Sequence, residues 1–421
     1  MPATREVVVT GVGVVCPIGV GRQEFWRALL EGRGGVRAIA SFDPSALPVR
    51  IAAEVLDFDP KLHVTPRKSL KVMSRDAQLG LPAAGLARAD AKWGAADYPP
   101  ERVGVVFGAD SIRSPLQESL PGYRGASRDG RFDFSLWGTL GMEATPPLTL
   151  LQNLPNMTQA HLSIAHDARG WGNTVHQAEV SGLWALAEAA AAIARGAADC
   201  TIAGAASSRM KPYDWVRSCL TERLSRRNDD PAAASRPFDA ERDGFVRGEG
   251  AAALILEERL QAERRGARVL ARIAGWGAAH AGRLSGDAGR GAALRRAVLT
   301  ALSQAGMRPA DIGHVNAHGL GTPDDDRMEA AVLGELFPRT PGTALKSLFG
   351  NLYAAGGAVE AAASVLALAE GLVPATVNFR RADDGVRLNI VSGPPLAGAP
   401  ATALLVNFTS AGQAAAMVLA L

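Results

Sequence analysis

Runs of small and β-branched apolar residues recur along the chain and predict buried strands. Strands covered on both faces read as continuous apolar runs, because neither face meets water. In the first half the predicted strands are 5–15, 102–108, 200–204 and 250–256. The second half repeats the pattern, with strands expected over 269–278, 314–317, 401–408 and 414–421.

Segments with a helical character lie between these runs. The predicted helices are 23–32, 178–195, 291–305 and 356–372. The segment 178–195 is rich in Ala, Leu and Glu and stops before Gly196, a residue that often ends a helix. Alternating strands and helices predict a layered α/β fold with mostly parallel strands. No long polar linker divides the chain, so we expect two halves, 1–258 and 259–421, packed as one body.

Composition excludes several classes of protein. With 47% hydrophobic and 21% charged residues, the 421-residue chain is neither disordered nor collagen-like. The net charge of +3 arises from 45 basic and 42 acidic residues without a basic patch, which disfavours nucleic-acid binding. The sequence contains no uncharged apolar stretch of about 18 residues and no recognisable signal peptide. We therefore expect a cytoplasmic protein without a membrane span.

The cysteines and several histidines show no metal or disulfide pattern. Cys16, Cys200 and Cys219 are far apart, odd in number and lack C-x-x-C spacing, so we expect packed thiols. Three histidines (His161, His166 and His176) likewise show no ligand spacing and are interpreted as structural or surface residues. No metal is expected.

Four long segments carry a resemblance to a known family. They are VVVTGVGVVCPIG at the start, RPFDAERDGFVRGEGAAALILE at 236–257, NAHGLGTPDDDRMEA at 316–330 and LKSLFGNLYAAGGAVE at 345–360. In sequence and order they resemble the motifs of β-ketoacyl synthases, the condensing enzymes of fatty-acid and polyketide synthesis. The resemblance implies the thiolase fold, a five-layer α-β-α-β-α body made of two similar halves, and normally a dimer.

The nucleophile segment departs from the family pattern. Members of the family carry a cysteine at the N-terminus of a helix, where the helix dipole favours the thiolate. The segment GWGNTVHQAEVSG at 170–182 aligns without a gap and places Glu179 at the cysteine position. A carboxylate is a poor acyl acceptor, because acyl transfer to it would form a reactive anhydride.

Most other catalytic positions of the family are retained or conservatively changed. His318 matches the first catalytic histidine, and Asn351 replaces the second while keeping a hydrogen-bond donor. Lys346 and Glu329 match the lysine and glutamate of the family. For these two residues an internal ion pair that holds the fold is an equal alternative to a catalytic role.

The resemblance also implies substrate-binding positions. Thr322 keeps one of two threonines that bind the phosphopantetheine arm, whereas Leu320 replaces the other. The loop after Phe408 normally reads GFGG and gates the site; here Ser410 and Ala411 occupy it, and Ala411 stands at the phenylalanine position.

Three functions remain open. The favoured one is a chain-length-factor-like subunit of a type II polyketide or fatty-acid-like synthase, which pairs with an active ketosynthase and shapes the tunnel for the growing chain. The second is an enzyme with altered chemistry on acyl or malonyl thioesters (acyl transfer, condensation or decarboxylation) that uses Glu179, His318 and Asn351. Ionised Glu179 would repel a malonyl carboxylate, which disfavours decarboxylation unless burial keeps the residue protonated. The third is a scaffold that binds acyl carrier protein without catalysis.

The expected partners follow from these functions. They are an acyl carrier protein and either a ketosynthase in a heterodimer or a second copy in a homodimer. No cofactor of the chain itself is expected, since substrates arrive on the phosphopantetheine of the carrier protein or on coenzyme A.

Overall fold

The strands predicted from the apolar runs are confirmed in the computed structural model, which describes residues 5–94, 96–110, 116–282, 285–384, 386–398 and 401–421. The strands of the first half are β1 (Val7–Cys16), β2 (Gly19–Val20), β5 (Val103–Gly108), β8 (Gly172–Val175), β9 (Cys200–Ser207) and β10 (Gly250–Glu258). Those of the second half are β11 (Ala271–His280), β12 (His314–Asn316), β13 (Pro341–Thr343), β15 (Asn389–Ile390), β17 (Thr402–Phe408) and β18 (Gln413–Ala420). Three two-stranded ribbons are β3 (Arg37–Ala38) with β4 (Ile51–Ala52), β6 (Ser127–Arg128) with β7 (Arg131–Phe132), and β14 (Leu372–Val373) with β16 (Leu396–Ala397).

The four predicted helices are also confirmed, with shifted ends. They are α1 (Arg22–Glu31), α6 (Ser181–Ala194), α9 (Gly286–Ala305) and α12 (Gly356–Glu370). The sequence analysis did not single out α2 (Arg75–Asp90), α5 (Met157–His166), α7 (Pro212–Thr221) or α10 (Pro323–Leu336). The remaining helices are α3 (Leu116–Gly125), α4 (Thr149–Asn153), α8 (Arg259–Arg264) and α11 (Lys346–Phe349).

The sheet shows that the two halves repeat one topology. From the centre outward the first half runs β1-β10-β9-β5-β8, and the second half runs β11-β18-β17-β12-β13. Numbered along the chain over these five strands, both halves follow the order 1-5-4-2-3, and the second half adds β15 beyond β13. The inner pairs are antiparallel and the outer pairs parallel in each half. A short antiparallel contact of β1 with β11 joins the halves.

The prediction of mostly parallel strands is therefore wrong for the middle of the sheet. The hairpin between β17 and β18 shows one reason, since two strands joined by a tight turn must be antiparallel. Thr409 N–H donates to Gln413 O at 2.9 Å, and Gly412 adopts a φ of +95° in that turn. Apolar runs reveal burial on both faces, but they do not reveal strand direction.

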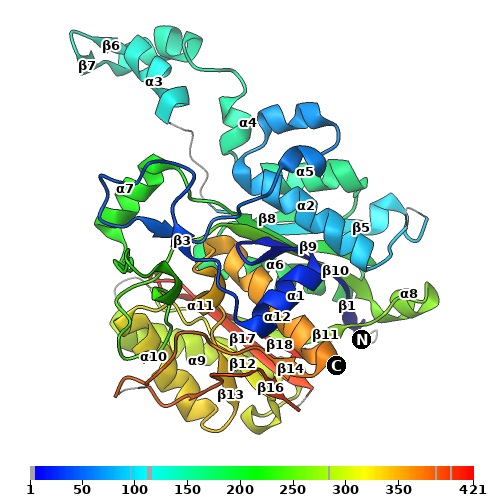
Figure 1. The fold of residues 1–421 in the computed structure, drawn as a ribbon. Coiled ribbons are helices and arrows are strands. Elements are labelled where there is room, and N and C mark those ends of the chain that lie inside the picture. Colours follow the sequence, from blue (N-terminus) through cyan, green and yellow to red (C-terminus); the bar gives the residue numbers. More distant parts are fainter. Residues whose placement is uncertain (1–4, 95, 111–115, 283–284, 385, 399–400) are drawn as a thin grey trace.

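Helices complete five layers and confirm the expected architecture (Figure 1). α2 and α5 cover the outer face of the first half, and α9 and α10 cover that of the second. α6 and α12 lie between the two halves of the sheet. Their close approach requires small residues, because a Cβ on Gly182 would lie 2.6 Å from the backbone nitrogen of Ala358.

One lobe stands away from this body. The segment from α3 to the ribbon β6–β7 projects from the layers in Figure 1. Tyr123, Phe132 and Trp137 pack on one another there, although Phe132 is half exposed. Phe134 beside them is 79% exposed. No helix among the described residues has the length and apolar character needed to cross a membrane.

Candidate functional site

Glu179 lies at the turn that connects β8 to α6. The turn is a short 3₁₀ helix, Ala178–Val180. Ala178 has a φ of +49°, a backbone conformation that residues other than glycine rarely adopt. Ser181 Oγ accepts a hydrogen bond from Gln177 N–H at 2.8 Å and fixes the turn. The predicted helix 178–195 therefore begins only at Ser181, and Glu179 precedes it. The structure places Glu179 at the N-terminal end of α6, as the alignment predicts.

Glu179 lines a small pocket with other predicted site residues. The pocket holds about 180 Å³, and its wall includes His318, Thr322, Phe408 and Ser410. Ala411 is exposed and is not among the residues that line this pocket. The wall also contains residues that sequence reasoning missed or did not place in the site: Thr221, Glu222, Arg223, Phe245, Leu320, Asp325 and Tyr353.

The hydrogen bonds of His318 determine which ring nitrogen carries its proton. His318 Nδ1 lies 3.2 Å from Lys346 Nζ and 3.2 Å from Asn407 Nδ2. Both neighbours are donors, so Nδ1 accepts and Nε2 carries the proton. Burial and the positive charge of Lys346 hold the pKa of His318 well below its usual range. His318 is therefore a neutral hydrogen-bond donor in the pocket, and its ring packs 4.4 Å from the Phe408 ring centre.

Lys346 and Glu329 both support His318, but not as a pair with each other. Lys346 forms a buried ion pair with Glu360 and donates from Nζ to His318 O at 2.8 Å. Glu329 accepts from the backbone N–H groups of His318 at 2.6 Å and Gly319 at 2.8 Å. Burial raises the pKa of Glu329 to about 8. The ion pair between Lys346 and Glu329 that the sequence analysis considered is not formed. Lys346 pairs instead with Glu360, which lies one turn into α12.

Asn351 is buried beside the pocket rather than in its wall. Its Oδ1 accepts from Tyr353 N–H at 3.1 Å. Its Nδ2 has no hydrogen-bond partner in the part of the chain that the structure describes. The side chain therefore keeps one spare donor, as expected from its chemistry, and is 1% exposed.

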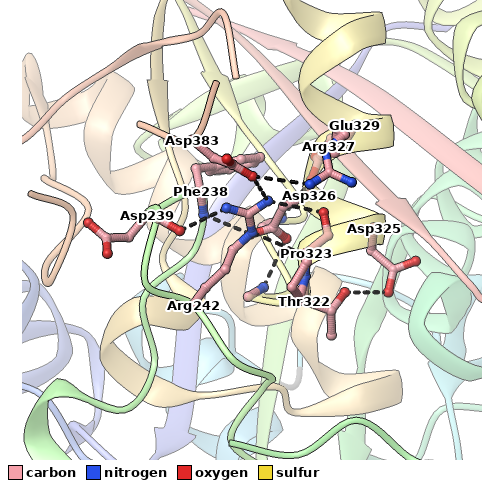
Figure 2. Close-up of polar contacts among 12 residues, drawn as sticks. Phe238, Asp239, Arg242, Thr322, Pro323, Asp325, Asp326, Arg327, Glu329 and Asp383 are labelled. Carbon is pink, nitrogen blue, oxygen red and sulfur yellow. Dashed lines mark hydrogen bonds and ion pairs between the residues drawn. The ribbon is translucent and has the colours of Figure 1, made fainter. Parts of the chain in front are cut away.

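A polar network fixes the loop that follows His318 (Figure 2). Asp326 accepts from Gly321 N–H at 2.9 Å and from Phe238 N–H at 2.7 Å. Arg242 lies 3.4 Å from Asp326 and 3.0 Å from Asp383. The network joins the segments that sequence analysis singled out at 236–257 and 316–330. Thr322, at the start of α10, donates to Asp325 at 2.6 Å.

A second network borders Glu179. Arg209 forms an ion pair with Asp110, lies 3.7 Å from Glu222, and is 4.0 Å from the centre of the Tyr353 ring. Tyr353 OH donates to Glu222 Oε2 at 2.8 Å. The signal for part of this network was present in the sequence, because Asp110 and Arg209 follow two predicted strands closely. Side chains after neighbouring parallel strands meet at one edge of the sheet.

The cysteines lie outside the pocket. Cys16 and Cys200 are buried in β1 and β9, and burial raises the pKa of Cys16 to about 12. Cys219 is half-buried in α7. Burial lowers the pKa values of His161 and His166. The side chain of His176 lies exposed on the surface. The described residues contain no cluster of His, Cys, Asp or Glu suited to a metal ion.

The repeated halves and the helix-terminal site between them define a thiolase-fold protein of the condensing-enzyme class. Residues 4–262 match the family Beta-ketoacyl synthase, N-terminal domain, and residues 270–380 match Beta-ketoacyl synthase, C-terminal domain. The chain belongs to the β-ketoacyl synthase family.

Relatives from polyketide synthesis are similar over most of the chain. The protein "Putative polyketide beta-ketoacyl synthase 1" of Streptomyces halstedii is 39% identical over 92% of this chain and 91% of that protein. "Actinorhodin polyketide putative beta-ketoacyl synthase 1" of Streptomyces coelicolor is 36% identical over 92% of this chain and 82% of that protein.

Solved structures of ketosynthases share the whole fold. "The ishigamide ketosynthase/chain length factor" has a TM-score of 0.85 and 26% identity, over 99% of both chains. The structure of a type II PKS acyl-carrier protein in complex with its ketosynthase bound to the hexaketide has a TM-score of 0.82 and 27% sequence identity, again over 99% of both chains. The chain is thus similar to ketosynthases and chain length factors of type II polyketide synthesis.

Proposed function

We propose that this protein is the chain-length-factor-like subunit of a type II polyketide or fatty-acid-like synthase and pairs with an active ketosynthase. The observation that carries the proposal is that Glu179, just before the start of α6, lines the same pocket as His318, and that the described residues of this wall include no thiol. Acyl transfer to Glu179 would give an anhydride, so elongation requires a partner that supplies the thiolate.

An open sheet edge supports the pairing. β8 is the last strand on its side of the sheet and pairs only with β5 among the described strands. Val105 N–H and Ala109 N–H donate to the carbonyls of Trp171 and Val175, so the odd-numbered residues of this segment face β5. Thr174 N–H therefore faces away from β5, and among the described residues its hydrogen-bond acceptor is Asn173 Oδ1, at 2.8 Å. An edge with free backbone groups is a template for a strand of another chain.

The pocket is proposed to receive an acyl thioester carried on phosphopantetheine. Its wall combines the His318 N–H donor with the rings of Phe245, Tyr353 and Phe408. Leu320 lies in the same wall, so one of the two threonine contacts to the arm is replaced by an apolar contact. The acyl carrier protein of the same synthase is the proposed source of the thioester.

Native mass spectrometry after co-expression with the ketosynthase encoded nearest to this chain tests the pairing. We expect a one-to-one heterodimer, which Thr174→Pro should weaken because proline removes the outward N–H. Thermal unfolding of the variant checks that its fold is intact. A stable homodimer that does not bind the co-expressed ketosynthase would refute the proposed subunit role.

The second candidate is an enzyme with altered chemistry on acyl thioesters. The placement of Glu179 and the neutral His318 donor in one pocket favours it. Turnover of acetyl- or malonyl-pantetheine by the isolated protein, lost in Glu179→Gln and His318→Ala, would support this function. Wild-type turnover in both variants would exclude it.

A further inference from the structure

Asn407, near the end of β17, is a fully buried polar residue that the proposed function does not use. β17 lies parallel to β12, and the register places Asn316 opposite Leu405. His318 and Asn407 each lie two residues beyond this pair, so both residues are found at the same edge of the sheet. Asn407 Nδ2 lies 3.2 Å from His318 Nδ1. Strand register therefore brings the amide of Asn407 to the histidine ring.

Glu360 determines which way the amide of Asn407 points. Asn407 Nδ2 donates to Glu360 Oε2 at 2.7 Å. A carboxylate only accepts hydrogen bonds, so the reversed amide would place Oδ1 and a carboxylate oxygen against each other. Oδ1 lies instead against Gly357 of α12, where a Cβ would collide with it. The amide nitrogen has two hydrogens, and the one that Glu360 does not accept is left for His318 Nδ1.

The same carboxylate holds a second donor beside the ring. Glu360 Oε1 accepts from Lys346 Nζ, which also donates to His318 O at 2.8 Å and lies 3.2 Å from His318 Nδ1. In the described part of the chain, both side-chain contacts of Nδ1 are therefore donors. A proton on Nδ1 would point at two N–H groups and find no acceptor there, and the hydrogen bonds at one ring nitrogen decide which nitrogen carries the proton.

We propose that Asn407 is a positioning residue for His318: its amide, oriented by Glu360, acts with Lys346 to keep Nδ1 free of a proton and fixes the ring as an Nε2–H donor. Glu360 acts at one remove, because it orients the two groups that contact the ring. His318 can then donate a hydrogen bond to a ligand in the pocket that it lines, but cannot take a proton through Nε2. The consequence for a ligand rests on the proposed function, whereas the tautomer does not.

Exchange of the amide and the carboxyl between positions 407 and 360 tests this role. The double variant Asn407→Asp/Glu360→Gln keeps one carboxyl beside Lys346 and almost the same side-chain volumes. It reverses the hydrogen bonds, because the glutamine donates to the aspartate and the aspartate presents an acceptor to His318 Nδ1.

Nitrogen-15 NMR of the full chain with labelled histidines reads the tautomer directly. A ring nitrogen that carries a proton resonates far upfield of one that does not. The variant His318→Gln identifies the signals of this ring among those of the seven histidines. In wild type at neutral pH we expect the proton on Nε2 and an unprotonated Nδ1.

The variants should move the Nδ1 signal in opposite directions. In the exchanged variant Nδ1 should gain a proton and its signal should move upfield. In Asn407→Leu, which removes one donor and leaves Lys346, Nδ1 should stay unprotonated and its signal should move downfield. A role in packing alone predicts that the exchanged variant, which is nearly isosteric, matches wild type.

Three results would overturn the proposal: a proton on Nδ1 in wild type, an unprotonated Nδ1 in the exchanged variant, or an unchanged Nδ1 signal in Asn407→Leu. Thermal unfolding checks that each variant is folded. If the exchanged variant does not fold, Asn407→Asp alone takes its place and should also put a proton on Nδ1. No ketosynthase partner enters these measurements, so the heterodimer experiment decides the subunit role separately.

Discussion

Replacement of Lys346 by methionine tests whether this residue is mainly a support for the site. Lys346 is 1% exposed and Glu360 2% exposed, and the two form an ion pair in which Glu360 also accepts from Asn407 Nδ2 at 2.7 Å. Lys346→Met leaves the Glu360 charge buried, with Asn407 as its one remaining side-chain donor among the described residues. Loss of one partner of a buried ion pair costs about 3–5 kcal/mol. We expect the free energy of unfolding to fall by that amount.

The double variant Lys346→Met/Glu360→Gln provides the decisive comparison. Glutamine removes the stranded charge and keeps an oxygen for Asn407, so the double variant should be about 2 kcal/mol more stable than Lys346→Met. Urea unfolding followed by tryptophan fluorescence measures all three proteins, with the exposed Lys68→Met as the matched control. A Lys346→Met protein that loses less than about 1 kcal/mol, or a double variant no more stable than the single one, would refute this reasoning.

Two further predictions concern the His318 loop. The pKa of Glu329 is raised from 4.5 to about 8, so its proton stabilises the fold at low pH and this stability is lost as pH rises through that window. The unfolding free energy of wild type should therefore decline with pH more steeply than that of Glu329→Gln; parallel curves would contradict this. Gly319 has a φ of +49°, and a Cβ there would lie 2.5 Å from that of Ala344. Gly319→Ala should cost at least about 2 kcal/mol, whereas Gly85→Ala, in open space within α2, should gain about 0.5–1 kcal/mol. Thermal melts that rank these two variants in the reverse order would refute the steric argument.

Local sequence patterns were sufficient for much of the fold. The apolar runs predicted the main strands because a strand that is buried on both faces carries apolar residues at consecutive positions. The glycine after 178–195 marked the end of α6, and the order of four motifs identified the family. Glu179 and His318 could be placed because each lies at the end of an element whose local sequence is distinctive.

Tertiary structure decided the partners of the site residues. Nothing in the sequence distinguishes Glu329 from Glu360 as the partner of Lys346, since both are glutamates in the first half of a helix. The packing of α12 between the two halves brings Glu360 to the lysine, while Glu329 caps backbone groups at the start of the His318 loop. Ala411 shows the opposite case, because alignment placed it at the gate but the turn before β18 directs it to solvent.

The sequence by itself determined the family, the main buried strands with the four predicted helices between them, and the presence of glutamate at residue 179, because each of these is encoded in contiguous residues. Strand direction at the centre of the sheet and the environment of Glu179 were decided only in three dimensions. Asp110, Arg209, Glu222 and Tyr353 come from four separate segments, and only the fold brings them into contact with one another.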